Sequence, residues 1–183
     1  MRAKWSPNIE GGEVVLRPLE PSDASAWFEY VSLPQVMQHT SSNVRVIEDL
    51  RPMFERFASE DPGSPVHFAI CGTEGQLVGT IGFHTISHVN RTAELTYDVR
   101  PSSWGHGIAT ACCKGAIAWG FSACGFVRVQ ATVLQANVAS IRVLEKGGFH
   151  REGQLRNFRM VRGEPRDFLL YATVPTNVPH AVV

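Results

Sequence analysis

The segment Trp104–Thr110, which reads WGHGIAT, could bind an anion through its main chain. Its two glycines stand between a predicted strand and a predicted helix. Glycine adopts conformations that other residues resist and lets a ligand approach the backbone closely. The start of a helix adds unpaired N–H groups and a positive dipole. The segment matches neither the Walker A loop nor GxGxxG, so by itself it predicts either a phosphate-binding turn or an ordinary tight turn.

A second polar cluster opens the helix predicted from Asn137, which ends at Gly147 and Gly148. Asn137 is a favourable N-cap residue, and Ser140 fits the first turn of any helix. Alternatively, both side chains face a ligand from the wall of a cleft. The spacing of these residues is compatible with either interpretation.

Charge is distributed unevenly, although the formal net charge of the whole chain is zero. Residues 1–98 carry a net charge of −6 and residues 99–183 carry +6. Eight of the ten basic residues in the second part are Arg, which binds phosphate in a bidentate manner. This asymmetry is typical either of an anionic partner on one side or of unrelated surface charge.

Composition excludes several classes of protein. The 44% hydrophobic and 19% charged residues are ordinary for a globular domain, and no apolar run reaches the roughly 20 residues of a membrane span. The four cysteines show no CxxC pair or zinc-like spacing, so we expect no metal site. The basic residues are not interleaved with aromatic ones, which argues against nucleic acid. The N-terminal segment lacks the apolar core of a secretory signal, and we expect a cytoplasmic protein.

Hydrophobic periodicity and turn residues predict a single mixed α/β domain over 1–183, with a core at about 13–173 and a tail at 174–183. The element order is βααβββαβαββ. Ser22 is expected to cap the first helix. The predicted strands are 14–19, 66–70, 77–83, 93–99, 126–134, 149–160 and 165–173. The predicted helices are one that opens at 21–23 and others at about 46–59, 107–123 and 137–147.

Taken together, WGxGIAT, the long helix, the next strand, N-x-x-S and the short helix resemble the GCN5-related N-acetyltransferase (GNAT) superfamily. The resemblance covers about residues 13–173. Trp104, the EGxLR segment at 152–156, Gly163, Asp167 and Tyr171 are similar to the branch of bacterial ribosomal-protein N-terminal acetyltransferases. The implied fold is a twisted, mostly antiparallel mixed sheet of about seven strands with helices on both faces. Ala111 stands where this branch often has Glu, so any role of that carboxylate is absent here.

The resemblance implies an acetyl-CoA site in the second half of the chain, where the basic residues would face a polyanion. The glycine turn would bind the pyrophosphate, and backbone near the end of the strand at 93–99 would pair with the pantetheine arm. Arg142 and Lys146 could equally be part of a solvated helix face. The expected cofactor-binding residues are Val99, Arg100, Trp104, Gly105, His106, Gly107, Ile108, Ala109, Thr110, Asn137, Arg142 and Lys146.

The reaction that the resemblance implies needs a base, because an amine must be neutral to attack a thioester. Glu94 matches the position where several GNAT enzymes carry this base, and Ser140 matches a position assigned the acid role in this branch. Asp98 and His84 are weaker alternatives for the base. A backbone N–H near Val99 is the expected donor to the thioester oxygen.

The expected function is transfer of acetyl from acetyl-CoA to a primary amine, most simply the α-amine of a protein or peptide. The acidic half would form the acceptor wall and attract a cation, with Trp27, Tyr30 and His39 as candidate lining residues. Two other interpretations are open. One is acetylation of a small amine such as a polyamine, an aminoglycoside or an amino acid, and the other is a non-catalytic acyl-CoA-binding module. A monomer and a homodimer are both compatible with the sequence.

Overall fold

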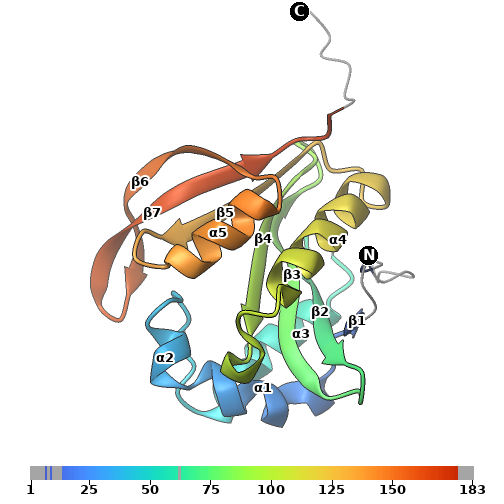
Figure 1. Ribbon diagram of the computed structural model, residues 1–183, viewed down its shortest axis with the longest axis vertical. Helices are drawn as coiled ribbons and strands as arrows, with labels where there is room; N and C mark the ends of the chain where they lie inside the picture. Colours follow the sequence, from blue (N-terminus) through green and yellow to red (C-terminus); the bar gives the residue numbers. More distant parts are fainter. Residues whose placement is uncertain (1–6, 8, 10–13, 62, 177–183) are drawn as a thin grey trace, which may run out of the picture.

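Seven strands form one sheet in the order β1-β2-β3-β4-β5-β7-β6 in the computed structural model (Figure 1), which describes residues 7, 9, 14–61 and 63–176. The strands are β1 (Val14–Pro18), β2 (Val66–Gly72), β3 (Leu77–Ser87), β4 (Thr92–Val99), β5 (Arg128–Leu134), β6 (His150–Val161) and β7 (Glu164–Thr173). All neighbouring strands are antiparallel except β4 and β5. The predicted fold class and strand number are confirmed.

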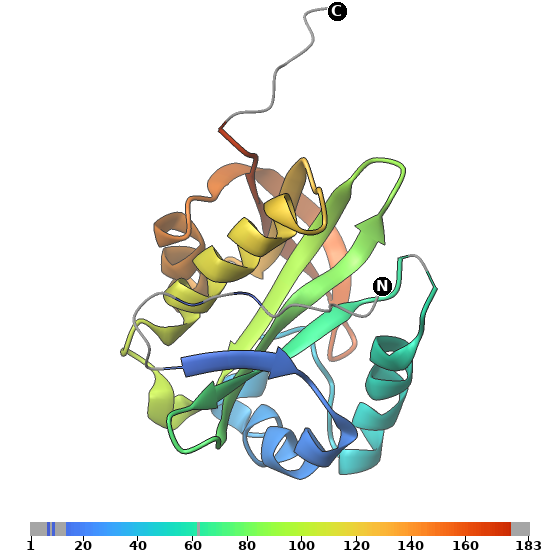
Figure 2. The ribbon, with the colours of Figure 1, turned by 90° about the vertical axis from the view of Figure 1, so that its right-hand side faces the viewer.

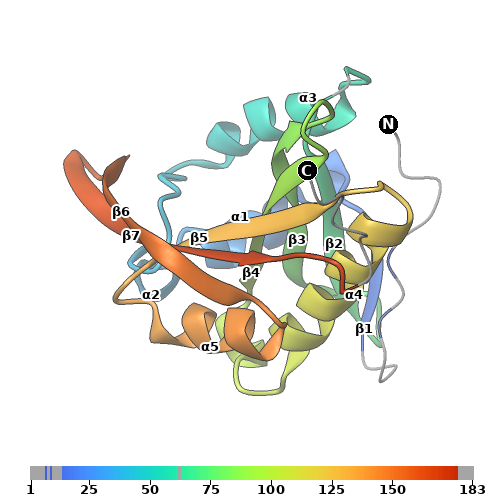
Figure 3. The same cartoon turned by 90° about the horizontal axis from the view of Figure 1, so that it is seen from above.

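Helices cover both faces of this sheet, as predicted (Figures 2 and 3). They are α1 (Ala24–Val31), α2 (Pro34–Met37), α3 (Arg51–Ala58), α4 (Ile108–Ser122) and α5 (Val138–Lys146). The α4 and α5 face encloses the larger apolar cluster, which includes Phe83, Cys112 and Val129. The α1 and α3 face encloses a second cluster around Trp27 and Leu50. Short α2 and the 3-10 turn Pro101–Ser103 are elements that periodicity did not predict, because three or four residues are too few to show a helical repeat. The 3-10 turns Pro21–Asp23 and Ile47–Leu50 fall within the predicted helices.

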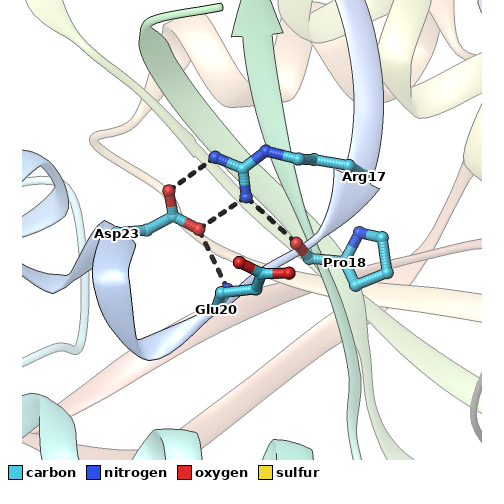
Figure 4. Close-up of polar contacts among 4 residues, drawn as sticks. All are labelled: Arg17, Pro18, Glu20 and Asp23. Atoms are coloured by element: carbon cyan, nitrogen blue, oxygen red, sulfur yellow. Dashed lines mark hydrogen bonds and ion pairs between the residues drawn. The ribbon is translucent and has the colours of Figure 1, made fainter.

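A bidentate ion pair ties the end of β1 to the start of α1 (Figure 4). Arg17 donates to both carboxylate oxygens of Asp23 at 2.6 and 2.7 Å, and the Glu20 amide donates to Asp23 at 2.9 Å. Burial alone would raise the pKa of the Asp23 carboxyl, but these bonds outweigh burial and hold that pKa below its usual range. Asp23, not the predicted Ser22, therefore supplies the side chain that closes this helix start.

The β6–β7 hairpin forms the far edge of the sheet and extends past α5 and α2 (Figure 1). Its tip is fixed to the opposite half of the chain, because the Arg162 guanidinium donates to the carbonyls of Met37 and Thr40 at 2.8 and 3.2 Å. No helix in the described part of the chain is long and apolar enough to cross a membrane. Most of the predicted tail, residues 177–183, lies outside the described residues, as does Glu13 at the predicted start of the core.

Candidate active site

The parallel strands β4 and β5 pair over three residues only, from Thr92 opposite Arg128 to Glu94 opposite Gln130. Beyond Glu94 the two strands separate, while β5 stays paired with β7 as far as Leu134. A cleft of about 410 Å³ occupies the gap. It is lined by the end of β4, the glycine turn and α5. The separation of the strands thus creates an opening next to residues that the sequence singled out.

The amide of Val99 points into this gap. Arg100 donates its amide to the Val78 carbonyl at 2.8 Å, on the β3 side of the strand. Because successive amides of a strand point to opposite edges, the Val99 N–H faces away from β3. The Val99 carbonyl, which points the same way, accepts the indole N–H of Trp104 at 2.7 Å. The end of β4 therefore presents a backbone donor to the cleft, as expected, and Trp104 holds the neighbouring acceptor.

The glycine turn has the open geometry that an anion site needs. Gly105 and Gly107 have φ values of +80° and +78°, and a Cβ built on either would meet no atom within 4 Å. Gly107 is the N-cap of α4, and the first intrahelical bond of this helix runs from the Ala111 amide to the Gly107 carbonyl. The preceding amides of residues 108–110 have no partner within the helix. These amides and the helix dipole form one wall of the cleft.

Helix α5 supplies the opposite wall. Arg142 and Lys146 both line the cleft from this helix and are exposed to solvent. Asn137 also lines the cleft, but both ends of its side chain are bonded to protein. Its Oδ1 accepts the Ser140 amide and its Nδ2 donates to the His39 carbonyl, each at 3.1 Å. Asn137 is thus an N-cap that also connects α5 to the segment after α2.

Two residues predicted to bind the cofactor lie outside the cleft. Arg100 turns toward α1, where its guanidinium donates to Glu29 at 2.9 Å and to the Ala26 carbonyl at 3.3 Å. Its amide is bonded to β3, so neither polar part of Arg100 faces the gap. His106 is exposed and does not line the cleft, in contrast to both flanking glycines. Sequence adjacency misled here, because alternate residues of a strand or tight turn face opposite ways.

A second hollow of about 120 Å³ adjoins the cleft and contains Glu94. His39, Thr40, Tyr97, Asn137 and Ser140 line both openings. The Tyr97 hydroxyl donates to the Ser140 carbonyl at 3.3 Å, so these residues bridge β4 and α5 where the two openings meet. Glu94, the candidate base, therefore lines the hollow, and Ser140, the candidate acid, lines both adjoining openings.

Glu94 is buried, and only one of its two carboxylate oxygens is bonded to the described residues. Its Oε1 accepts the Thr132 hydroxyl at 2.5 Å and the Arg159 guanidinium at 2.8 Å. His84 Nε2 lies 3.9 Å from the same oxygen. Burial lowers the pKa of His84, although Glu94 opposes that shift, so this imidazole is neutral at neutral pH. Among the described residues, no donor is bonded to Glu94 Oε2, which leaves that oxygen for a ligand or water.

Thr132 and Arg159 were not among the residues that the sequence singled out. A signal for Thr132 is present, because Val129, Ala131 and Val133 alternate with it along β5 and Gln130 stands opposite Glu94. Gln130 and Thr132 therefore share the face of Glu94. Arg159 has no such signal, because it is 65 positions from Glu94 in the chain and belongs to the hairpin.

Asp98 is engaged in a separate buried network on the α1 face of β4. Its carboxylate accepts the Tyr30 hydroxyl at 2.5 Å, the Thr80 hydroxyl at 3.0 Å and the Trp27 indole at 3.2 Å. Burial raises the pKa of the Asp98 carboxyl, and the three donors oppose that effect. With so many bonds to protein, Asp98 is poorly placed to accept a proton from an amine. It instead fixes the strand position next to Val99.

The structure also corrects the expected acidic wall. Glu94 and Asp98 are the carboxylates among the described residues that line the two openings, and each is bonded to protein donors. Two other acidic residues of the first half form ion pairs elsewhere, Asp23 with Arg17 and Glu29 with Arg100, and the other described ones do not line either opening. Trp27 and Tyr30 are buried in the core rather than exposed to an acceptor. The net charge of −6 in residues 1–98 is therefore not displayed at the site.

A parallel strand pair that opens beside a glycine turn and a helix start defines a class of acyltransferases that use a CoA thioester. The chain matches the model of the Acetyltransferase (GNAT) domain over residues 13–150. The protein therefore belongs to the GNAT acetyltransferase family and is an N-acetyltransferase, as the sequence predicted. Family membership supports an enzyme over a non-catalytic acyl-CoA-binding module.

Known proteins similar to this chain include N-acetyltransferases, one of which has a name that states its acceptor. It is 34% identical over 172 residues to the uncharacterized N-acetyltransferase YoaA of Bacillus subtilis (strain 168), covering 92% of this chain and 97% of YoaA. It is 26% identical over 155 residues to spermidine N(1)-acetyltransferase of Escherichia coli (strain K12), covering 84% and 82%. Mycobacterium smegmatis RimJ in complex with CoA-disulfide superposes with a TM-score of 0.82 at 28% identity, covering 96% of this chain and 88% of RimJ.

We predict that the bond from Tyr30 to Asp98 contributes more to stability than the other tyrosine bond at the site. Tyr30→Phe should lower the free energy of unfolding by about 1.5–3 kcal/mol, because it removes a donor from a buried carboxylate. Tyr97→Phe is the matched control, since its hydroxyl donates over 3.3 Å to the neutral Ser140 carbonyl. It should cost about 0.5–1.5 kcal/mol. Urea unfolding of both variants measures the difference, and equal losses would contradict the ranking.

Proposed function

We propose that this protein acetylates the α-amine of a protein or peptide, using acetyl-CoA bound in the cleft between β4 and β5. The observation that carries the proposal is that the cleft and the hollow that contains Glu94 adjoin and share five lining residues. If the thioester lies where the two openings adjoin, the amine would reach it through the hollow and the CoA arm would lie in the cleft. The α-amine acceptor follows from the resemblance to the N-terminal acetyltransferase branch, and the name of the spermidine enzyme supplies the alternative, a small amine.

The cleft suits a polyanionic co-substrate. In this proposal the pyrophosphate lies on the amides of residues 108–110, where the open sides of Gly105 and Gly107 admit it. Arg142 and Lys146 face the same opening and supply positive charge. The pantetheine arm extends along the end of β4, toward the Val99 amide. Arg100 and His106 are not included, because their side chains lie elsewhere.

The reaction is a direct attack of the amine on the acetyl carbonyl carbon. The new C–N bond forms as the C–S bond breaks, and the Val99 N–H stabilises the developing negative oxygen. Glu94 Oε2 takes the proton that the amine loses, directly or through water. The Ser140 hydroxyl donates a proton to the departing thiolate and regains one through water from the protonated Glu94, so that the amide and the free CoA thiol are the net products. Val99 lines the cleft, Glu94 lines the hollow, and Ser140 lines both.

An α-amine is the acceptor that the electrostatics favour. The Glu94 carboxylate is already paired with Arg159 and His84 is neutral, so the hollow offers no net negative charge to hold an ammonium ion. A cation in such a site loses hydration without a compensating partner. An amine that enters neutral avoids this cost, and α-amines have pKa values of about 7.7–8.0 against about 10.4 for Lys. Polyamines resemble Lys in this respect.

We predict that Gly107→Val abolishes most acetyl-CoA affinity while the protein stays folded. The new side chain would occupy the open space beside the helix N-terminus, where the phosphates approach. Calorimetry should show at least a tenfold rise in Kd, on the order of the loss of one charge-assisted contact. A folded variant with wild-type affinity would place the pyrophosphate elsewhere.

Gly75→Val is the matched control for this substitution. Gly75 has φ +81°, and a Cβ there would also meet no atom within 4 Å, but it lies in the turn between β2 and β3. Both substitutions therefore impose similar backbone strain, of about 1–2 kcal/mol. Only the substitution at Gly107 should change the Kd for acetyl-CoA.

We predict that Glu94→Gln slows the reaction at every pH at which the Glu94 carboxylate is ionised. An amine that enters neutral carries an extra proton once its nitrogen has added to the thioester, so loss of the base that removes this proton should lower kcat/KM by about 10²-fold or more. The rise of kcat/KM with the neutral fraction of the α-amine, up to about pH 8, should be the same in variant and wild type. Acetyl-CoA affinity should not change, because Glu94 lies outside the cleft. Glu74→Gln, at an exposed position in the β2–β3 turn, is the control, and a kcat/KM of Glu94→Gln equal to wild type would move the base to His84 or solvent.

A panel of acceptors tests the proposed substrate class. We expect release of free CoA thiol with lysine-free peptides that carry a free α-amine, and much less with spermidine or an aminoglycoside. N-acetylated copies of the same peptides are the control and should be inert. Efficient turnover of spermidine or an aminoglycoside, with none for any peptide, would make the small-amine alternative correct.

A further inference from the structure

Arg159 reaches from the outermost strand of the sheet into the hollow that contains Glu94. Its guanidinium lies 5.0 Å from the ring of Phe158 and 5.5 Å from that of Phe168. Its Nη2 donates to Glu94 Oε1 at 2.8 Å. The Arg159 side chain is 31% exposed and that of Glu94 only 5%. The arginine therefore forms the outer wall of the hollow and holds its positive charge against the buried carboxylate.

An irregularity in β6 sets the position of Arg159. Leu155 pairs with Phe168 and Arg159 pairs with Arg166, so three residues of β6 stand opposite the single residue Asp167 of β7. Such bulges redirect the side chains of a strand. Asn157 adopts φ +47° within the bulge. The Asp167 carboxylate fixes it by accepting the Asn157 amide and the Gln154 side chain, each at 2.8 Å.

Side-chain hydrogen bonds fix the hairpin that carries Arg159 at three places along its length. Asp167 fixes the bulge, the Arg162 guanidinium joins the tip to the carbonyls of Met37 and Thr40, and Arg128 bonds to Glu152 through two oxygens near the base, at 2.6 and 2.9 Å. A side chain mounted on a fixed hairpin has little freedom to withdraw when a ligand enters. The positive charge of Arg159 is thus a permanent part of the acceptor hollow.

We propose that Arg159 determines acceptor specificity by neutralising Glu94 and thereby excluding amines that stay protonated. This inference rests on the proposed function, since it assumes that acceptors enter beside Glu94. With the arginine in place, an acceptor must arrive as the neutral amine. At neutral pH the neutral fraction of an α-amine exceeds that of a Lys-like amine by a factor of roughly 300. Without the arginine, Glu94 would be an unpaired carboxylate, able to hold an ammonium ion.

Three variants at this position separate charge from shape. Arg159→Met removes the charge and keeps an unbranched apolar chain beside the two Phe rings. Arg159→Gln also removes the charge but can still donate to Glu94. Arg159→Lys keeps the charge and is the matched control. The measurement is kcat/KM for spermidine divided by kcat/KM for a lysine-free peptide with a free α-amine.

We expect this ratio to rise at least tenfold in Arg159→Met and Arg159→Gln, and to stay within about threefold of wild type in Arg159→Lys. Acetyl-CoA affinity, measured by calorimetry, should be unchanged in all three, because Arg159 does not line the cleft. This second measurement identifies a variant that fails to fold, and the remaining uncharged variant then decides the test.

The possible failures are distinguishable. If the wild-type enzyme acetylates no peptide, the proposed acceptor class is wrong, whatever the variants do. If the wild-type enzyme acetylates peptides but both uncharged variants keep its ratio, the role assigned to Arg159 is wrong and the proposed function stands. A raised ratio in Arg159→Lys as well would show that guanidinium geometry, not charge, sets specificity, and would also overturn the inference.

Discussion

The short parallel pairing of β4 and β5 is the constraint on which the site depends. Two strands that stayed paired to their ends would satisfy their backbone groups and leave no gap. Because pairing stops at Glu94 and Gln130, the Val99 amide is left without a strand partner on its open side. The same separation brings the starts of α4 and α5 to the two sides of the gap (Figure 1). One irregularity in the sheet thus supplies a cleft, a backbone donor and an anion-binding helix terminus.

The β6–β7 hairpin has a corresponding role on the acceptor side. β5 loses β4 as a neighbour but keeps β7 along its length, so the sheet continues past the gap and reaches β6. Residues that resembled the N-terminal acetyltransferase branch lie in this hairpin and organise it. Glu152 binds Arg128, Asp167 fixes the bulge, and the Tyr171 hydroxyl donates to Glu145 on α5 at 3.2 Å. These residues therefore support the hairpin and α5 and do not line the cleft.

Local rules predicted most of the fold and part of the site. Alternation and turn residues located all seven strands, and the glycine turn was found because two glycines before a helix are a local signal. The sequence did not indicate side-chain contacts that depend on the alternation of residues along a strand or on partners far away in the chain. Arg100 follows Val99 yet its amide faces β3, and Arg159 contacts Glu94 across 65 positions. Charge summed over half a chain was also a poor guide, because it does not tell which carboxylates line the openings.

The two openings share Tyr97 and Ser140 as lining residues but must bind groups of different charge. The cleft must attract phosphates, and it combines helix amides with Arg142 and Lys146. The hollow must admit an amine and remove its proton, so excess negative charge there would retain the ammonium form and oppose its deprotonation. A carboxylate balanced by a fixed guanidinium on Oε1, with Oε2 unbonded to any described residue, avoids this conflict. The charge balance at Glu94 therefore favours entry of a neutral amine, and Oε2 is the oxygen that would accept its proton.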